Sequence, residues 1–264
     1  MKIRLLCVLA LSALSLAACT SKEDQPVAYK EFRINNIKFT SNGAKTAWSS
    51  EGHFFWRNSD GLYVNGVRYV MDNSTGDCWY AVRADGGDPV KKVNNKFYLA
   101  YYGYGSNDVS LKFIENQGVY YPEYEEEDWY NGVSSYVPLA ACVSDNNVTL
   151  TPCCAILRVQ VATSGYLDIF NADGEQMGPF VMHGSIDPVT ARFVDINSYL
   201  YASLPFAPGE DNNTCYFVLP MENDEETIAG MVFHFDDGSS DVGTTASSIT
   251  IRKGYIYDIN LMAQ

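Results

Sequence analysis

The stretch that decides the fold is Val148–Ala162, which reads VTLTPCCAILRVQVA. Apolar residues occupy alternate positions in its second half, and a period of two is the spacing of side chains along a β-strand. One face of this strand would carry Cys153, Ala155, Leu157, Val159 and Val161, and the other face Arg158 and Gln160. Because helical spacing of apolar residues does not persist beyond about two turns anywhere in the chain, we predict an all-β protein.

The segment Tyr29–Thr40 shows the same alternation with one interruption. Its apolar residues are Phe32, Ile34, Ile37 and Phe39. The apolar residues change from even to odd positions between Ile34 and Ile37, across Asn35 and Asn36. One extra residue in the strand, a β-bulge, would return both apolar pairs to the same side. We therefore expect all four side chains on one face of this first strand.

Period-two runs recur along the rest of the chain with turn-forming residues between them. Further strands are expected at His53–Trp56, Gly61–Val70, Trp79–Arg83, Phe97–Tyr102, Val109–Ile114, Tyr166–Phe170, Arg192–Ile196, Cys215–Leu219, Ile228–Phe235 and Ser248–Leu261. Many short strands at near-regular spacing favour β-sandwiches, and a chain of this length favours two sandwiches over one. We place the boundary near Ser164, with one sandwich over 28–163 and the second over 164–264.

The composition indicates a folded protein that does not bind nucleic acid. The chain has 264 residues, of which 47% are hydrophobic, and this fraction supports packed cores. It carries 18 Lys and Arg against 32 Asp and Glu, a formal net charge of −14. Because contact with phosphates needs clustered basic residues, the acidic balance argues against a nucleic-acid partner.

The N-terminus predicts a lipoprotein signal peptide. Lys2 and Arg4 precede the apolar run Leu5–Leu16, which is too short to span a bilayer as a helix. Small residues then lead to Cys19, as in a bacterial lipobox. We expect residues 1–18 to be removed, Cys19 to carry palmitate or similar acyl chains, and residues 19–27 to form the lipidated tether. The alternative is an ordinary signal-peptidase site.

The tether contains a short charged motif, Lys22, Glu23 and Asp24. It resembles the Lys-acidic-acidic export tag on surface lipoproteins of some Gram-negative anaerobes. Together with the acylated cysteine, this motif predicts a protein anchored by lipid in the outer membrane and exposed at the cell surface.

Five cysteines remain after removal of the signal peptide and acylation of Cys19. They are Cys78, Cys142, Cys153, Cys154 and Cys215. Their number is odd and no C-x-x-C pair occurs, so neither a zinc site nor a complete disulfide framework is suggested. We expect small buried hydrophobic residues, with one incidental disulfide as the alternative. The neighbours Cys153 and Cys154 should point to opposite faces of their strand.

The sequence contains no recognisable catalytic or metal-binding motif. The histidines are His53, His183 and His234, and none has metal-ligand spacing to another. The acidic run Glu123–Trp129 could be imagined as the paired acids of a glycosidase, but such a run is more often a solvated loop. Asp72–Asp77 and Asp236–Asp241 offer oxygens for Ca²⁺ without the Glu of an EF-hand, so turns are favoured. We predict no enzyme activity, no cofactor and no metal.

The abundance of tyrosine, 19 residues, is the strongest indication of a ligand or partner surface. The candidate aromatic residues are Tyr101, Tyr102, Tyr104, Tyr120, Tyr121, Tyr124 and Trp129. Alternation sends Tyr101 to the opposite side of its strand from Tyr98 and Tyr102, so these rings cannot all face one core. Some would then lie at the surface or against a partner. The alternative is that these residues only satisfy β-propensity.

Four segments follow one another over most of the chain. They are Trp48–His53 (WSSEGH), Lys96–Tyr104 (KFYLAYYGY), Val148–Val159 (VTLTPCCAILRV) and Ile251–Leu261 (IRKGYIYDINL). In sequence and order they resemble segments of the fimbrillin family of type V pilus subunits. The resemblance implies two transthyretin-like β-sandwich domains behind a lipoprotein signal peptide, and assembly into a fimbria by donation of a strand between subunits.

The resemblance also implies how a subunit becomes ready to accept a strand. In fimbrillins a protease that cuts after Arg removes the first strand and opens a groove. Here that strand would be Tyr29–Thr40, whose four apolar side chains would be the plugs of the groove. The next basic residues are Lys45 and Arg57, and neither stands out as a processing site. The implied partners are other fimbrial subunits and, for adhesion, a host protein or glycan.

The end of the sequence bears on the position of such a subunit. Only Met262–Gln264 follow the last expected strand, fewer than the roughly five residues that a donated strand needs. We therefore expect an accessory subunit at the tip or the anchor of a fimbria, which accepts a strand more readily than it donates one. The alternative function is a monomeric surface lipoprotein that binds glycan through its aromatic residues.

Overall fold

The computed structural model describes residues 28–35, 37–41, 51–53, 56, 58, 60–74, 76, 78–101, 137–176, 178–199, 203–206, 213–243 and 248–262. The expected signal peptide, the expected acylation site Cys19, the expected export tag and the expected strand Val109–Ile114 lie outside these residues. Over the described ranges, no helix is long and apolar enough to cross a membrane.

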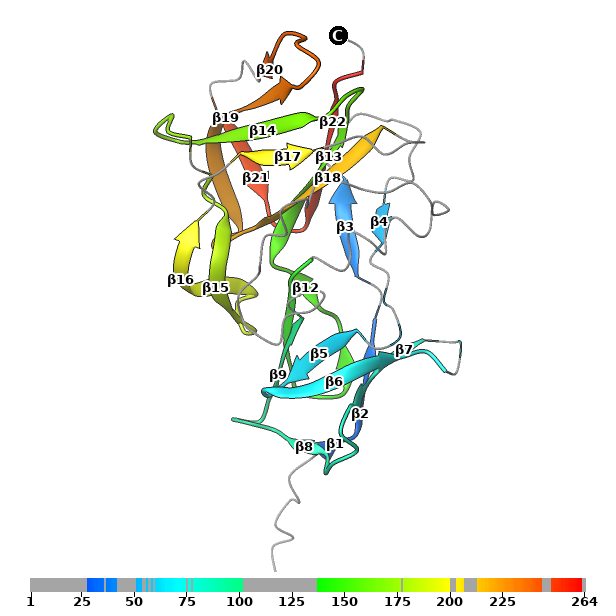
Figure 1. The fold of residues 1–264 in the computed structure, drawn as a ribbon. Helices are drawn as coiled ribbons and strands as arrows, with labels where there is room; N and C mark the ends of the chain where they lie inside the picture. Colours follow the sequence, from blue (N-terminus) through cyan, green and yellow to red (C-terminus); the bar gives the residue numbers. More distant parts are fainter. Residues whose placement is uncertain are drawn as a thin grey trace, which may run out of the picture.

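The all-β prediction is confirmed: the described residues form strands and no helix (Figure 1). The eight-stranded sheet has the order β11 (Asn147–Val148), β2 (Glu31–Ile34), β7 (Trp79–Arg83), β6 (Val67–Asp72), β5 (Gly61–Val64), β9 (Phe97–Tyr101), β10 (Leu139–Val143) and β12 (Thr151–Pro152). The central sheet has the order β18 (Thr214–Pro220), β13 (Cys154–Gln160), β22 (Tyr255–Asn260), β3 (Lys38–Ser41) and β4 (Glu51–His53).

The third sheet, here called the outer sheet, has the order β17 (Leu204–Phe206), β14 (Gly165–Asn171), β19 (Glu225–Phe235) and β20 (Val242–Gly243), and β21 (Ile249–Arg252) also pairs with β19. Two small pairs complete the fold: β1 (Ala28–Tyr29) with β8 (Val90–Lys91), and β15 (Val181–Asp187) with β16 (Arg192–Tyr199). Figure 1 shows the central sheet between the other two.

In the central sheet, alternate residues of β18, β13 and β22 enter two different hydrophobic cores. Its contribution to the first core, shared with the eight-stranded sheet, is Phe39, Cys154, Ile156, Tyr216, Val218 and Ile256. Its contribution to the second core, shared with the outer sheet, is Ala155, Leu157, Val159, Cys215, Phe217, Leu219 and Tyr257. Strand β13 therefore has no solvent face. It hydrogen-bonds to β18 and β22, which lie beyond the expected domain boundary near Ser164 in the sequence.

Of the two polar residues that the sequence analysis placed on the second face of β13, Gln160 is half-buried and Arg158 is buried. Arg158 is 7% exposed. Its guanidinium Nε donates to the Asp258 carboxylate, which lies directly opposite on β22 in the parallel register. This pair satisfies the one charged side chain on β13, since an unpaired buried charge would be strongly destabilising.

Three middle strands of the central sheet continue strands of the flanking sheets. β2 runs into β3 through residues 35–37, β12 into β13 through Cys153, and β21 into β22 through Lys253-Gly254. Tyr29–Thr40 and Ser248–Leu261 were each expected to be one strand. Ser248–Leu261 is instead divided between two sheets, and Tyr29–Thr40 among three, since Tyr29 pairs with Val90 of β8. The parity change between Ile34 and Ile37 marks a crossing between sheets rather than a bulge within one.

Backbone hydrogen bonds join the three crossings to one another. The Gly254 N–H donates to the Cys154 carbonyl at 2.8 Å, and the Thr40 N–H donates to the Gly254 carbonyl at 2.9 Å. Gly254 adopts a φ of 77°, in the left-handed region that glycine tolerates best. The turn that starts β22 is thereby fixed against both β13 and β3.

The β15–β16 hairpin covers the crossing at Cys153. Cys153 packs in a small third cluster with Val181 and Phe193 of that hairpin. Lys253, at the neighbouring crossing, donates to the Ala191 carbonyl at 2.8 Å and pairs with Asp224 at 2.7 Å. Hydrogen bonds from Arg192 and then Lys253 lower the pKa of Asp224. These contacts hold the hairpin against the central sheet.

Several other elements differ from the sequence prediction. The expected strand Gly61–Val70 is a hairpin of β5 and β6 that turns at Asn65-Gly66, with positive φ at both residues. The sequence analysis expected no strand at β10 or at β15. β10 lies between β9 and β12 in the eight-stranded sheet. The strand Trp79–Arg83 is confirmed to the residue as β7.

Neighbouring substitutions on β13 test whether both of its faces carry packing energy. We expect Ile156→Ala, in the first core, and Leu157→Ala, in the second, each to lower the free energy of unfolding by about 2–5 kcal/mol, since each leaves a cavity. Urea unfolding followed by far-UV circular dichroism measures the change. Val189→Ala, at a side chain 63% exposed, is the control and should change it by less than about 0.5 kcal/mol. A loss below about 1 kcal/mol for either core variant would contradict the two-faced packing of this strand.

Candidate functional site

The candidate site is the first-strand groove, defined as the surface that residues 28–41 occupy on the rest of the protein. Along β2 exposure alternates: Glu31 and Arg33 face solvent, whereas Phe32 and Ile34 are 0% and 3% exposed. After the crossing, Ile37 and Phe39 are 2% and 4% exposed. All four belong to the first core, but they reach it from two strands of different sheets and not from one face of a single bulged strand, as had been expected.

Phe32 lies in a cluster of aromatic rings. Its ring centroid lies 4.9 Å from Phe97 and 5.6 Å from Tyr69, both edge-on, and 5.9 Å from Tyr29. The Tyr69 hydroxyl donates to the Tyr29 carbonyl at 3.4 Å. Edge-to-face ring pairs of this kind add about 0.5–1.5 kcal/mol each beyond the area they bury.

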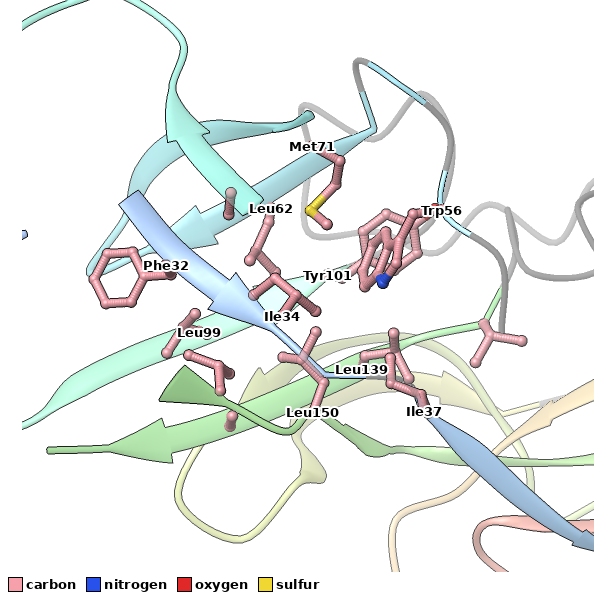
Figure 2. Close-up of a cluster of buried hydrophobic side chains, with 14 of the residues drawn as sticks. Phe32, Ile34, Ile37, Trp56, Leu62, Met71, Leu99, Tyr101, Leu139 and Leu150 are labelled. Atoms are coloured by element: carbon pink, nitrogen blue, oxygen red, sulfur yellow. The ribbon is translucent and has the colours of Figure 1, made fainter. Parts of the chain in front are cut away.

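The other plugs enter an aliphatic part of the same core. Figure 2 shows Ile34 and Ile37 pointing into a cluster that also contains Leu99, Leu139 and Leu150. Full burial of one such side chain contributes about 1.5–3 kcal/mol, so the four plugs together contribute on the order of 6–12 kcal/mol. That sum is as large as the net stability of a typical domain. The groove therefore needs an occupant for the protein to stay folded.

Backbone pairing of β2 is strong on one side and brief on the other. β7 pairs antiparallel with all four residues of β2. On the other side β11, the edge strand of the sheet, pairs with only Arg33 and Ile34. The Arg33 and Asn35 N–H groups donate to the carbonyls of Asn146 and Val148 at 2.7 and 2.8 Å. The groove thus offers a strand backbone on each side and apolar pockets below.

The prediction that Tyr101 belongs to a ligand or interface surface is wrong. Tyr101 is 1% exposed, and its ring lies edge-on to Trp56 at 5.1 Å in the first core (Figure 2). The reason is the parity of β9, which turns Phe97, Leu99 and Tyr101 inward together. The other candidate aromatic residues lie outside the described residues: Tyr102, Tyr104, Tyr120, Tyr121, Tyr124 and Trp129.

The five cysteines are free thiols, and Cys153, Cys154 and Cys215 are buried. Cys153 and Cys154 belong to different clusters, as expected for neighbours on opposite faces. Burial raises the pKa of Cys153 and of Cys215 to about 12, and raises the pKa of Cys154 well above its usual range. Thiols of this kind scarcely form the thiolate that metal binding or nucleophilic attack requires.

In the two acidic stretches considered for Ca²⁺, aspartates accept hydrogen bonds from serines of their own turns. Asp72 accepts hydrogen bonds from the Ser74 N–H at 2.9 Å and from its hydroxyl at 3.1 Å. Asp237 accepts from the Ser239 N–H at 2.8 Å. Within the part of the chain that the structure describes, no group of three or more His, Cys, Asp or Glu side chains could hold a metal ion.

The rings around Phe32 were not singled out from the sequence. Tyr29, Tyr69 and Phe97 each lie in a segment expected to be a strand, but which strands pair, and therefore which rings meet, is set by the sheet order. Trp56 was likewise expected only as the end of a strand. Its 5% exposure identifies it as a core residue that packs on the far end of β9.

The sequence matches no protein-family profile and no curated protein. Solved structures to which the chain is similar are fimbrial and putative cell adhesion proteins. One is a putative cell adhesion protein from Bacteroides uniformis, 10% identical, with a TM-score of 0.43 over 89% of this chain and 95% of that one. Another, from Bacteroides fragilis, is 11% identical with a TM-score of 0.41 over 87% and 92%. The C-terminally truncated tip fimbrial protein Mfa3 from Porphyromonas gingivalis is 10% identical, with a TM-score of 0.39 over 89% and 96%.

Adjacent residues of β2 give a matched test of the groove. We expect Phe32→Ala to lower the free energy of unfolding by about 3–5 kcal/mol, because it empties a fully buried ring site. Arg33→Ala, whose side chain faces solvent one position along, should change it by less than about 0.5 kcal/mol. Chemical denaturation of the two variants beside the unmodified protein measures both. Equal losses for the two would show that the groove does not depend on its plugs.

Proposed function

We propose that this protein is a subunit of a fimbria with an adhesive role, and that it joins its neighbour by strand exchange at the first-strand groove. In this proposal residues 28–41 fill the groove until they are removed, and a strand from another subunit then takes their place. The partners are other fimbrial subunits and, for adhesion, a host protein or glycan.

The alternation of β2 is the observation that carries the proposal. A strand with buried Phe32 and Ile34 and solvent-facing Glu31 and Arg33 makes all its side-chain contacts on one face. Any extended segment with large apolar residues at the same spacing could make equivalent contacts and use the same backbone groups of β7 and β11. Because an empty groove would forfeit most of the stability of a domain, exchange of one occupant for another is favoured over release.

The packing of β22 supports a role as acceptor rather than donor. β22 lies inside the central sheet between β13 and β3, and it carries Ile256 into the first core and Tyr257 into the second. Withdrawing this strand would break both ladders and uncover both cores. We therefore propose a tip or anchor position, where a subunit accepts a strand without giving up one of its own.

We further propose that Cys19 carries the lipid that anchors the precursor in the outer membrane, and that Lys22, Glu23 and Asp24 direct it to the cell surface. This part of the proposal rests on the sequence alone. The alternative, a monomeric glycan-binding lipoprotein, loses Tyr101 from its set of binding aromatics because that ring is in the core.

Strand exchange can be tested with the segment itself. A specific protease site placed directly after Ser41 allows residues 28–41 to be cut from the folded protein without loss of contacts in the groove. We expect the cut protein to take up a fluorescent peptide of the sequence 28–41, measured as fluorescence that migrates with the protein on a native gel. Uncut protein is the first control and should take up none.

A second peptide separates groove binding from nonspecific binding. It carries Phe32→Asp and Ile34→Asp and keeps the length and the solvent-facing residues of the first. Because carboxylates cannot enter the apolar pockets without a large desolvation cost, this peptide should fail to exchange. Equal uptake of both peptides, or uptake of neither, would overturn the proposed mechanism.

The anchor is tested separately. We expect labelled palmitate to enter the protein when it is expressed in a bacterium with a lipoprotein pathway. Cys19→Ala should abolish the label and release the protein from the membrane fraction, because the acyl chains supply most of the membrane affinity. Cys7→Ala is the matched control and should keep the label. Label that persists in Cys19→Ala would refute acylation at this cysteine.

A further inference from the structure

A polar cluster on the outer sheet has no role in the groove or in either core. His234 of β19 lies between two carboxylates: its Nε2 is 3.2 Å from Asp168 Oδ2 and its Nδ1 is 2.8 Å from Asp241 Oδ2. Asp168 belongs to β14, and Asp241 belongs to the turn that leads from β19 to β20. The imidazole therefore connects this turn to the middle of the sheet.

The surrounding contacts fix the ring and one of its partners. Tyr166, the cross-strand neighbour of His234, stacks on the imidazole with ring centroids 4.4 Å apart and planes inclined by 16°. Asp168 is only 8% exposed, and its Oδ1 accepts from the Ser203 hydroxyl at 2.5 Å and from the Gln176 amide at 2.8 Å. The charged or titratable groups shown facing the ring are thus Asp168 and Tyr166 of β14 and Asp241 of the turn.

The arrangement differs from that of a serine hydrolase. In a nucleophilic triad the hydroxyl bonds to the imidazole, which removes its proton. Here the Ser203 hydroxyl bonds to Asp168, on the far side of the carboxylate from the ring. The cluster is built to hold an imidazole in place rather than to activate an alcohol.

The number of protons on the His234 ring determines how many of its two carboxylate contacts can be hydrogen bonds. A neutral imidazole donates through one nitrogen and accepts through the other, whereas an imidazolium donates through both. Two carboxylates can both accept from this ring only when it carries two protons. With one proton, a ring lone pair faces a carboxylate oxygen, and one of the two contacts becomes repulsive.

We propose that His234 is a proton-operated clamp that holds the β19–β20 turn on the outer sheet while the ring carries two protons and loosens the turn when one is lost. The strand it secures is short. β20 pairs with β19 through only two residues, Val232 with Gly243 and Phe233 with Val242. Loosening of β20 uncovers the edge of β19 at these positions, where backbone groups then need another partner.

The direction of the effect follows from the charges. The clamp stabilises the turn while the ring is an imidazolium and both aspartates are ionised. Its contribution is lost as pH rises and the ring gives up its second proton. It is also lost in stronger acid, where the aspartates take up protons. Protection of the turn against hydrogen exchange should therefore pass through a maximum between these two losses.

The first measurement uses the unmodified protein. Two-dimensional ¹H–¹⁵N spectra of the histidine ring nitrogens report whether a ring carries one proton or two, and His234→Gln identifies the His234 signals by their loss. We expect a ring that carries two protons at the acid end of a pH series and changes to a single tautomer as pH rises. A ring that stays singly protonated across this range would overturn the proposal.

The second measurement is hydrogen exchange of the peptide Asp236–Gly243, corrected for the pH dependence of intrinsic exchange. Protection should fall roughly three- to tenfold as the ring loses its second proton, the change expected for a partly exposed charge-assisted hydrogen bond. Asp241→Asn should abolish this pH dependence. Asp237→Asn, in the same turn but bonded to the Ser239 N–H, is the matched control and should keep it. Protection that does not change with pH in the unmodified protein, or an equal loss in both variants, would contradict the clamp.

Discussion

The fold depends on one constraint: β13 and β22 must each present alternate side chains to two different cores, while β3 beside them carries Phe39 into the first core. This is possible because each of them continues a strand of a flanking sheet, so that the chain enters the central sheet already paired on one side. The bonds among Thr40, Gly254 and Cys154 fix the three crossings in register. Once they are in place, the residues of β13 alternate between the first core and the second, and Arg158 must find Asp258 on the adjacent strand.

The same arrangement separates the parts of the molecule that can be exchanged from those that cannot. Residues 28–41 are replaceable for two reasons. The buried side chains of β2 lie on one face, and β3 pairs with β22 through only two residues. β22 and β13 are not, since each supports both cores. A subunit built this way would accept a strand at its N-terminal segment and keep its own C-terminal strand. That asymmetry is the physical basis of the proposed tip or anchor role.

Sequence periodicity predicted strands well and sheet membership poorly. The alternation in Val148–Ala162 identifies the strand, but a period of two looks the same whether the second face meets solvent or another core. The plugs from Phe32 to Phe39 were assigned to one side by assuming a bulge, whereas the parity change marks a crossing between two sheets that face the same core. The inward position of Tyr101 required knowledge of which face of β9 is covered. His234 and Asp168 lie 66 residues apart, and their meeting depends on the β14–β19 register, which no local pattern reveals.

We infer that the two cores form one cooperative unit, joined through the central sheet. Native-state hydrogen exchange in increasing denaturant tests this claim most directly, by comparing the slowest amides of β6 and β9, which line the first core, with those of β14 and β19, which line the second. The account predicts that both sets converge on a single free energy of opening, equal to that of global unfolding. Two well-separated values, with one set of amides opening while the other stays protected, would contradict it.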